Sequence, residues 1–479
     1  PKTHEPLFQE TLINAGLNKY LFEMTNIRNQ CSWVHKQDMQ TATEQAKDLV
    51  RMSVAKVALQ EPLEEPVMNI NQAVLVIGSG VAGMIAARTL SQQGYTTHLV
   101  EKDSRLGGRA LYLNETWQGE NVGRFVEDLI DHVQKDNHIS VHLNSDIRDV
   151  DGFVGDFKTS VQTGGETAVL EHGVTIIACG AAEFKPDYYL YGQDDRVLTG
   201  LELQLKIKEG SSFEACRTAV FVQCVGSRIE ERPYCSKVCC TRSIKSALEL
   251  KALNSDMDIF ILYRDLRSYG LREDLYRTAR EKGIKFIRYH SAGGIAVSRV
   301  QEGLGVEFTD RVLRRPMVIH SDMLVLASAM VPEKNNALAP LYKITQKADG
   351  FFAEAHVKLR PNDFATDGVF VCGLAHAPKP LDESIAQAQA AASRAVTVLS
   401  ALQIAVSGTV AWVDPSFCSQ CGVCVAVCPY SAPDFNDKTG KAEIQSTLCK
   451  GCGLCTASCR SGAINLKGFE TSQIMAMIT

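Results

Sequence analysis

The chain has 479 residues, of which 45% are hydrophobic and 22% charged, with 35 glycines and 15 prolines. This is ordinary globular composition, and it excludes a disordered, collagenous or low-complexity chain. The 50 basic and 55 acidic residues leave a formal net charge of -5, so no basic surplus points to nucleic acid. No continuous apolar run reaches the roughly 18 residues of a membrane span. At about 150 residues per domain, the length suggests about three domains.

The 16 cysteines are unevenly spread, with four between positions 224 and 240 and eight between 418 and 459. Disulfide frameworks belong to small secreted domains, and nothing here resembles a signal peptide, so metal centres are the better interpretation. Residues 1–7 read like the middle of a domain, which suggests a fragment or a processed chain. Residues 1–60 are expected to be mostly helical, and 61–71, with two prolines, reads as a linker.

The segment 74–101 has the pattern of a dinucleotide-binding unit. An apolar strand over 74–77 leads into the glycine turn GSGVAG, a helical pattern over 84–90 and a second strand over 96–100 that ends at Glu101. The three glycines permit a tight turn, close approach of a pyrophosphate, and close helix–strand packing. The acidic residue is expected to accept hydrogen bonds from ribose hydroxyls, and a glycine turn without a ligand is the alternative. The predicted cofactor contacts here are Gly78, Gly80, Val81, Ala82, Gly83, Glu101 and Lys102.

The residues after Glu101 indicate FAD rather than NAD. The segment 106–109, LGGR, resembles the continuation found in FAD-binding disulfide-reductase-like flavoproteins. Segment 174–180 is similar to that family's strand ending in A-T-G, with Cys179 in place of Thr. Segment 366–373 is similar to its closing flavin strand, but Leu374 stands where Asp is usual, and Asp382 or Glu383 are candidates to replace it. The further predicted flavin contacts are Gly108, Arg109, Ala178, Gly180 and Gly373.

A second cysteine-rich motif lies where these flavoproteins carry a nicotinamide-binding domain, here residues 216–317. The expected strand 219–223 leads into cysteine rather than a second glycine fingerprint, so a nicotinamide cofactor would lack its phosphate loop. Four cysteines within 17 residues suggest an iron–sulfur cluster, with buried inert thiols or a zinc site as alternatives. The predicted ligands are Cys224, Cys235, Cys239 and Cys240. Arg228, Lys237 and Arg242 are candidates to offset cluster charge, or else solvated surface residues.

The C-terminal cysteines form a duplicated C-x2-C-x2-C-x3-C motif, repeated after 31 residues. This is the pattern of bacterial two-cluster ferredoxins, in which the fourth cysteine of each run ligates the other cluster. A pair of structural zinc sites is the alternative, which the duplicated spacing disfavours. One [4Fe–4S] cube would use Cys418, Cys421, Cys424 and Cys459, and the other Cys449, Cys452, Cys455 and Cys428.

Together these segments resemble the A-type subunit of heterodisulfide reductase, a flavin and iron–sulfur component of cytoplasmic electron-transfer complexes. Segments 15–35, 224–240 and 381–388 and the terminal ferredoxin motif carry the resemblance, which covers nearly the whole chain. It implies that Cys31 ligates an N-terminal cluster whose other ligands would precede Pro1; a partly buried thiol is the alternative. Relative to the family the chain reads as truncated at its N-terminus, and 111–150, which lacks cysteine, lacks the ferredoxin-like insertion of some members.

The resemblance implies an α/β fold: a doubly wound, disulfide-reductase-like two-domain FAD flavoprotein, with a helical N-terminal arm and a C-terminal α+β ferredoxin domain. The expected domains are 1–70, the arm or remnant of an iron–sulfur domain; 71–215 and 318–402, the two parts of the FAD domain; 216–317, a nucleotide-binding-like domain with the central cluster; and 403–479, the ferredoxin domain.

No nucleophile–base constellation is evident, so we expect electron transfer through FAD and clusters rather than group transfer. His376, close after the closing flavin strand, is the one histidine expected near the flavin. The resemblance implies a cytoplasmic, electron-bifurcating subunit. Its implied partners are heterodisulfide-reductase B- and C-like subunits, a hydrogenase- or formate-dehydrogenase-type donor, and ferredoxin. A freestanding NAD(P)H:ferredoxin-type oxidoreductase, and a redox-sensing or scaffold protein with structural clusters, are the alternatives.

Overall fold

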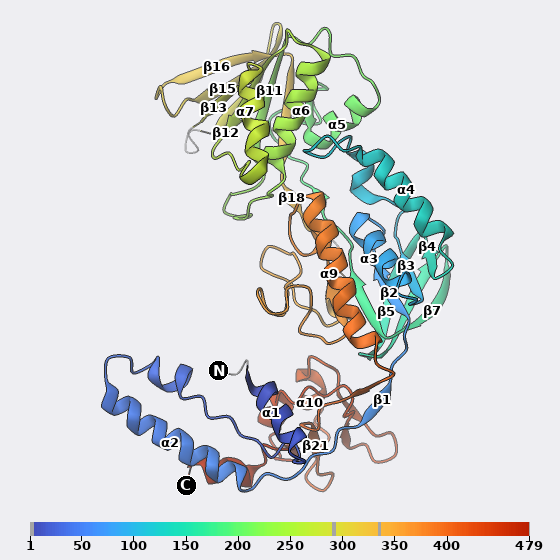
Figure 1. The fold of residues 1–479 in the computed structure, drawn as a ribbon, viewed down its shortest axis with the longest axis vertical. Coiled ribbons are helices and arrows are strands. Elements are labelled where there is room, and N and C mark those ends of the chain that lie inside the picture. The colour runs from blue at the N-terminus through green and yellow to red at the C-terminus, as the bar shows by residue number, and fades with distance from the viewer. Residues whose placement is uncertain (1–3, 290–293, 334–336, 479) are drawn as a thin grey trace. The chain divides into compact units, whose positions relative to one another are not determined.

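The structure, a computed structural model, describes residues 4–289, 294–333 and 337–478 and falls into two compact units (Figure 1). Unit 1 comprises residues 1–69 and 403–479, and unit 2 comprises residues 70–402. None of the helices within the described ranges is both long and apolar enough to traverse a lipid bilayer.

Unit 2 contains two halves of the same design, each a five-stranded parallel sheet with helices on one face and a three-stranded antiparallel meander on the other. The first sheet has the order β19-β8-β2-β3-β4. Its strands are β2 (Val74–Ile77), β3 (Thr97–Val100), β4 (Ile139–His142), β8 (Val174–Ile177) and β19 (Val369–Val371). The helices are α3 (Val81–Ser91), α4 (Val122–Lys135) and α9 (Leu381–Leu399), and the meander is β5 (Ser145–Phe153), β6 (Asp156–Thr163) and β7 (Glu166–His172).

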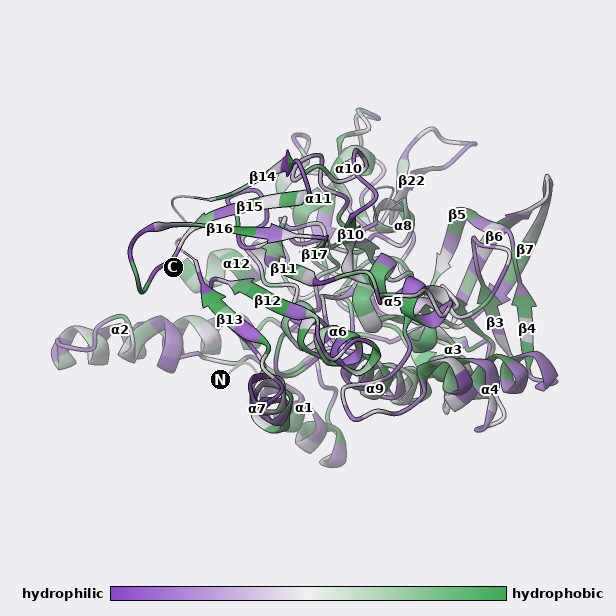
Figure 2. Cartoon of the chain, turned by 90° about the horizontal axis from the view of Figure 1, so that it is seen from above, coloured by the Kyte–Doolittle hydropathy of each residue, from purple (hydrophilic) through white to green (hydrophobic). Residues whose placement is uncertain are grey.

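The two faces of this sheet follow from the alternation of side chains along each strand. In β2, Val74 and Val76 pack with the helices, whereas Leu75 and Ile77 pack with the meander. All four are buried, which is why the strand reads as a continuous apolar run. Helix α4 is amphipathic, and Figure 2 shows hydrophilic and hydrophobic residues on different sides of it.

The second sheet has the order β10-β17-β11-β12-β13 and is also parallel. Its strands are β10 (Val197–Thr199), β11 (Thr218–Val225), β12 (Asp258–Tyr263), β13 (Lys285–Arg288) and β17 (Met323–Ser328). Helices α5 (Gly200–Lys208), α6 (Cys239–Leu253) and α7 (Glu273–Glu281) cover one face, and the meander β14 (Ile295–Val300), β15 (Gly303–Thr309) and β16 (Pro316–Ser321) covers the other. The expected domain 216–317 is therefore too short, because β10 and β17 lie outside those limits. The short strands β9 (Ala182–Glu183) and β18 (Met330–Val331) pair antiparallel where the chain passes between the halves.

Unit 1 joins the N-terminal arm to the ferredoxin-like C-terminus. The arm contains α1 (Glu5–Asn14), the π-helical turn η2 (Arg28–Ser32), α2 (Met39–Val57) and β1 (Val67–Asn69), which pairs with β20 (Gln403–Ala405). The C-terminal part contains β21 (Ala411–Val413), α10 (Val423–Val427), β22 (Pro433–Phe435), β23 (Ala442–Ile444), α11 (Leu454–Ser458), β24 (Ile464–Leu466) and α12 (Thr471–Ile478). The buried ammonium of Lys56 on α2 lies 2.7 Å from Glu23 and 3.8 Å from the centre of the Phe469 ring, so the arm and the C-terminus share one core.

Candidate functional site

A cavity of about 700 Å³ opens at the carboxyl ends of β2, β3 and β8 in unit 2. Ligands of doubly wound sheets bind at this edge. Its walls come from the β2–α3 turn, the segment after β3, the turn η3 (Gly108–Tyr112) and the start of α9. Every predicted flavin contact lines the cavity except Gly83 and Gly373.

The three fingerprint glycines have three different surroundings. Gly78 has φ +101°, and a Cβ there would lie 2.5 Å from the carbonyl oxygen of Ala178. A Cβ on Gly83 would lie 1.8 Å from the carbonyl oxygen of Gly78, so this glycine allows α3 to pack on β2 and does not face the cavity. A Cβ on Gly80 would meet no described atom within 4 Å, because the cavity lies there. Gly80 is also the N-cap of α3 and gives it no side-chain cap, so the helix N-terminus is open to an anionic group such as a pyrophosphate.

Glu101 lies at the end of β3 and is almost fully buried. Its Oε2 accepts hydrogen bonds from the backbone N–H and hydroxyl of Ser79, at 2.7 and 2.6 Å, and its Oε1 accepts from the N–H of Asp103 at 2.9 Å. The carboxylate therefore ties the glycine turn to the neighbouring strand as well as lining the cavity. A ribose hydroxyl bound here would share oxygens that already accept protein hydrogen bonds.

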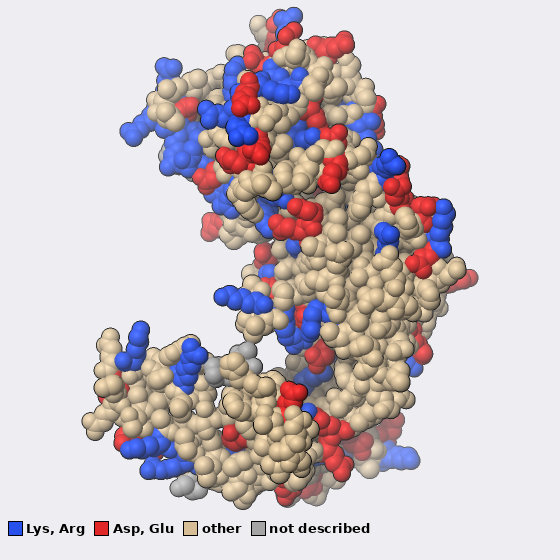
Figure 3. All heavy atoms as spheres, in the orientation of Figure 1, with Lys and Arg blue, Asp and Glu red and all other residues tan. Residues whose placement is uncertain are grey.

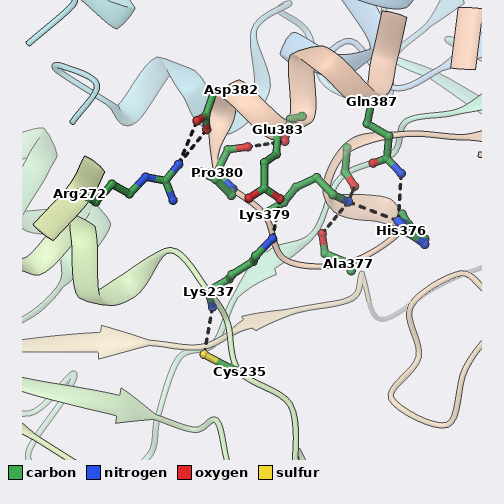
Figure 4. Close-up of polar contacts among 12 residues, drawn as sticks. Cys235, Lys237, Arg272, His376, Ala377, Lys379, Pro380, Asp382, Glu383 and Gln387 are labelled. Atoms are coloured by element: carbon green, nitrogen blue, oxygen red, sulfur yellow. Dashed lines mark hydrogen bonds and ion pairs between the residues drawn. The ribbon is translucent and has the colours of Figure 1, made fainter. Parts of the chain in front are cut away.

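Lys379 also lines the cavity, although the sequence analysis did not identify it (Figure 4). Its ammonium donates hydrogen bonds to the carbonyl oxygens of Gly373, at 2.7 Å, and Ala377, at 3.1 Å. Burial lowers the pKa of Lys379 to about 8. A cation in this place can interact with negative charge that develops on a bound cofactor.

His376, expected near the flavin, does not line the cavity. Its Nε2 lies 2.9 Å from the carboxylate of Glu354, which in turn pairs with Lys347 at 2.8 Å. Gln387 donates to its Nδ1 at 3.0 Å. Burial lowers the pKa of His376, so the ring is neutral at pH 7 and helps to order the segment that carries Lys379.

Asp382 and Glu383, the candidates to replace the missing Asp at Leu374, are paired with cations from the second half of unit 2. Asp382 lies 2.9 Å from Arg272, and Glu383 lies 2.5 Å from Lys237 (Figure 4). Asp382 lines the cavity and Glu383 does not. Both carboxylates thus connect the start of α9 with the cysteine-bearing half.

We expect the substitution Lys379→Met to stabilise the cofactor-free chain at neutral pH. The folded pKa of about 8 lies below the ordinary value of 10.5, so the folded chain binds this proton less tightly than the unfolded chain. The cost is complete below pH 8 and disappears as the pH rises toward 10.5. The gain should be about 2 kcal/mol at pH 7, allowing for the two hydrogen bonds lost, and should vanish above pH 10. Urea unfolding at both pH values measures it. Lys347→Met, at a partly exposed ion pair, is the matched control, and a gain independent of pH would contradict the interpretation.

The four central cysteines come together where β11 ends and α6 begins. Cys224 follows the buried part of β11 with φ +63°, and Cys239 and Cys240 open α6. The pKa of Cys239 is raised, first by its interaction with Cys240 and then by burial, with smaller effects from Cys224 and Cys235, so all four thiols are neighbours. The N–H of Lys237 donates to the sulfur of Cys235 at 3.3 Å, a contact typical of iron–sulfur sites. Among the described residues, no three or more His, Cys, Asp and Glu side chains are arranged to hold a single metal ion.

The C-terminal cysteines lie in two related halves, in which α10 and α11 each begin after a left-handed glycine, Gly422 or Gly453. A small cavity is lined by all four cysteines of the second predicted set: Cys428, Cys449, Cys452 and Cys455. Cys428 thus lies with the run that follows it rather than only with its own, as expected from the crossed pattern.

The other predicted set is also brought together. The N–H of Val423 lowers the pKa of Cys421, and the nearby Cys459 acts in the opposite sense. Burial raises the pKa of Cys424, and Cys418 and Cys421 are close enough to add to this effect. Backbone N–H groups of Ala411, Ala432 and Ala442 donate to the sulfurs of Cys449, Cys428 and Cys418 at 3.3–3.5 Å. Such N–H···S bonds stabilise iron–sulfur clusters, so these residues fit the cofactor.

Cys31 lies in the π-helical turn of the arm and is buried. Its thiol donates a hydrogen bond to the carbonyl oxygen of Ala42 at 2.8 Å. That contact is the surrounding of a partly buried thiol, and ligation of a cluster by Cys31 stays a prediction.

Comparisons with known proteins agree with this geometry. Residues 72–216 match the family described as pyridine nucleotide-disulphide oxidoreductase, and residues 417–463 match the 4Fe-4S dicluster domain. A T. acidophilum thioredoxin reductase structure has a TM-score of 0.50 at 13% identity, covering 69% of this chain and 98% of its own, which supports the fold alone. The chain is thus a disulfide-reductase-type flavoprotein joined to a two-cluster ferredoxin domain.

Curated relatives define the family. The A-type subunit of the H(2):CoB-CoM heterodisulfide,ferredoxin reductase of Methanothermobacter thermautotrophicus is 33% identical, covering 100% of this chain and 86% of its own. The A-type iron-sulfur subunit numbered 2 of the CoB–CoM heterodisulfide reductase of Methanopyrus kandleri is 34% identical, covering 92% and 82%. The chain belongs to the family of A-type subunits of heterodisulfide reductase. It is an oxidoreductase component with FAD and [4Fe–4S] clusters as cofactors, which confirms the expected fold class and cofactors.

Proposed function

We propose that this chain passes electrons between the flavin cavity and its iron–sulfur clusters within a heterodisulfide-reductase-like complex, and that it bifurcates electron pairs delivered to the flavin. The observation that carries the proposal is the replacement at the end of β11. A nicotinamide-binding domain has its phosphate loop there, whereas this chain places Cys224 and three further cysteines. The electrons therefore reach the flavin through clusters rather than from a bound nicotinamide.

The site residues have distinct parts in this proposal. FAD supplies the conversion between two-electron and one-electron transfer when it is bound. The glycine turn and the start of α3 hold its pyrophosphate, and Lys379 places a positive charge at the cavity wall. The ion pairs Lys237–Glu383 and Arg272–Asp382 hold the central cysteines at a fixed place relative to the cavity. The C-terminal cubes form the route to a partner.

The partners follow from the chemistry and from the names of the relatives. Relatives are named as H(2)- and H(2)/formate:CoB-CoM heterodisulfide,ferredoxin reductase subunits. For this chain we propose a hydrogenase- or formate-dehydrogenase-type donor, ferredoxin as the low-potential acceptor, and B- and C-like subunits on the high-potential route, all in the cytoplasm. Substrate specificity then resides on those partners.

An anaerobic titration tests the proposal. We expect that reduced ferredoxin or dithionite bleaches the flavin of the reconstituted chain, whereas NADH and NADPH do not. The substitution Cys224→Ser should slow the electron exchange between ferredoxin and flavin at least tenfold. Cys216→Ser is the matched control, since Cys216 is a partly buried thiol of the same half whose only described contact is the carbonyl of Thr218. Rapid bleaching by NADPH would favour a freestanding oxidoreductase, and no exchange between clusters and flavin would favour a structural role.

A further inference from the structure

We propose that Arg228 and Arg264 contact the central cluster as hydrogen-bond donors and positive charges, and so set its midpoint potential apart from those of the other clusters. This inference rests on the proposed function, because it requires that Cys224, Cys235, Cys239 and Cys240 hold a cluster. The observation that carries it is a pair of buried guanidinium N–H donors left without partners beside Cys224.

The position is defined by two adjacent strands. In a dinucleotide-binding domain the first strand ends in the phosphate loop, and the second ends in the residue that reads the ribose. Here β11 and β12 are parallel neighbours, with Val222 opposite Leu262. Continuing that register places Cys224 at the end of β11 beside Arg264, which follows β12 directly. The nucleotide-reading position is therefore occupied by a cation next to a cysteine.

The arginines are held by a network that fixes their orientation. Arg264 donates to the carbonyl oxygens of Arg228, at 3.0 Å, and Ser227, at 2.7 Å. Arg228 and Arg288 each donate to the carboxylate of Asp265, both at 2.7 Å. This network contains three guanidinium groups and one carboxylate, which leaves two positive charges uncompensated within it. Figure 3 shows Lys and Arg gathering over the same part of unit 2, so the excess extends to the surface.

Two donors in this network have no partner among the described residues. They are Nη1 of Arg228 and Nε of Arg264, and the hydroxyl of Ser227 between them is in the same state. A buried donor left unsatisfied costs about 1–3 kcal/mol, and more when charged, so native proteins rarely retain several together. Arg264 and Arg228 are the cations that act on Cys224, so the missing acceptor lies at the thiols. The sulfides and thiolates of a [4Fe–4S] cluster are acceptors of the required charge.

The consequence is a redox one. Reduction of the cluster adds one electron and one negative charge, with no bond made or broken and no proton required. Donors and positive charge at the sulfurs stabilise the more negative state and raise the potential, and net charge and hydrogen bonding are the terms that tune such clusters. The C-terminal cubes receive backbone N–H bonds, but none of the guanidinium contacts that the described residues show runs to their sulfurs.

The test is an anaerobic redox titration of the reconstituted full chain, followed by electron paramagnetic resonance. We expect Arg264→Gln to lower the midpoint of one cluster so that its reduction becomes at least tenfold less favourable, a shift of about 59 mV for one electron, without loss of iron. Arg264→Lys should give a smaller shift, because it keeps the charge but loses the planar donor. Arg277→Gln is the matched control: it removes the same charge from an exposed position on α7 of the same half.

Each other outcome overturns a defined part. If Arg264→Gln and Arg228→Gln leave every midpoint unchanged while Cys240→Ser removes one cluster, the inference is wrong and the proposed function stands. If Cys240→Ser removes no cluster, the central cluster does not exist and the proposed function fails at that point. If the unaltered chain binds NADPH and Arg264→Gln abolishes that binding, the arginines read a nucleotide phosphate instead. Should Arg264→Gln fail to fold, Arg228→Gln and Arg264→Lys give the same comparison.

Discussion

Replacing Gly80 with valine is expected to give a folded chain that no longer retains FAD. Gly80 has φ -62°, a conformation open to any residue, and a Cβ there meets no described atom within 4 Å. The added side chain therefore costs the protein little, but it fills the space at the start of α3 where the pyrophosphate should lie. We expect flavin content to fall at least tenfold, measured as the ratio of flavin to protein absorbance after reconstitution, with an unfolding temperature of the cofactor-free chain close to that of the unaltered chain.

Gly83→Ala is the comparison that separates binding from folding. The added methyl group would lie 1.8 Å from the carbonyl oxygen of Gly78, so α3 and β2 would have to move apart. This smaller substitution should both lower the unfolding temperature and reduce flavin content, because it damages the turn itself. Stoichiometric FAD in Gly80→Val would show that the cavity is not the flavin site.

The flavin site could be predicted from sequence wherever it depends on residues close together in the chain. The strand 74–77, the glycine turn and the strand ending at Glu101 form one local unit, and the structure reproduces their bounds within a residue or so. The second use of Glu101, as acceptor from Ser79, was not foreseen, although a serine inside a fingerprint is a signal for it. Lys379 was missed because the segment before α9 reaches the cavity from nearly 300 residues beyond the turn, and sequence spacing carries no information on that approach.

The limits of the second half were misplaced for a topological reason. Its sheet needs β10 and β17, which flank the cysteine-bearing segment and reach the sheet only through parallel crossovers. A boundary read from composition follows the chain, whereas a parallel sheet gathers strands that the chain separates. The same principle brought Arg264 to Cys224: they are 40 positions apart in sequence but terminate neighbouring strands. Cys224 itself was predictable, since it stands at the end of an apolar strand where a glycine was expected.

Serine at Cys428 is expected to remove the cluster of the other run rather than that of its own. Cys428 follows Cys418, Cys421 and Cys424 in the sequence, yet it lines a small cavity with Cys449, Cys452 and Cys455. The double variant Cys428→Ser/Cys452→Ser should therefore lose no more iron than either single variant, about one cube, because both residues serve the same cluster. Cys428→Ser/Cys421→Ser should lose two cubes. Iron analysis and electron paramagnetic resonance of the reduced protein measure both.

This comparison depends on non-additivity rather than on the size of any single loss. Two ligands of one cluster form a unit, so the second substitution finds nothing left to remove, whereas ligands of two clusters act independently. Cys216→Ser, in unit 2, should leave the iron content unchanged. If instead Cys428→Ser/Cys421→Ser loses one cube and Cys428→Ser/Cys452→Ser loses two, each run holds its own cluster. The contact of Cys459 with Cys421 would then have no role in ligation. The crossed arrangement makes each cube depend on both halves of the domain, so the ferredoxin fold and its two cofactors should be gained or lost together.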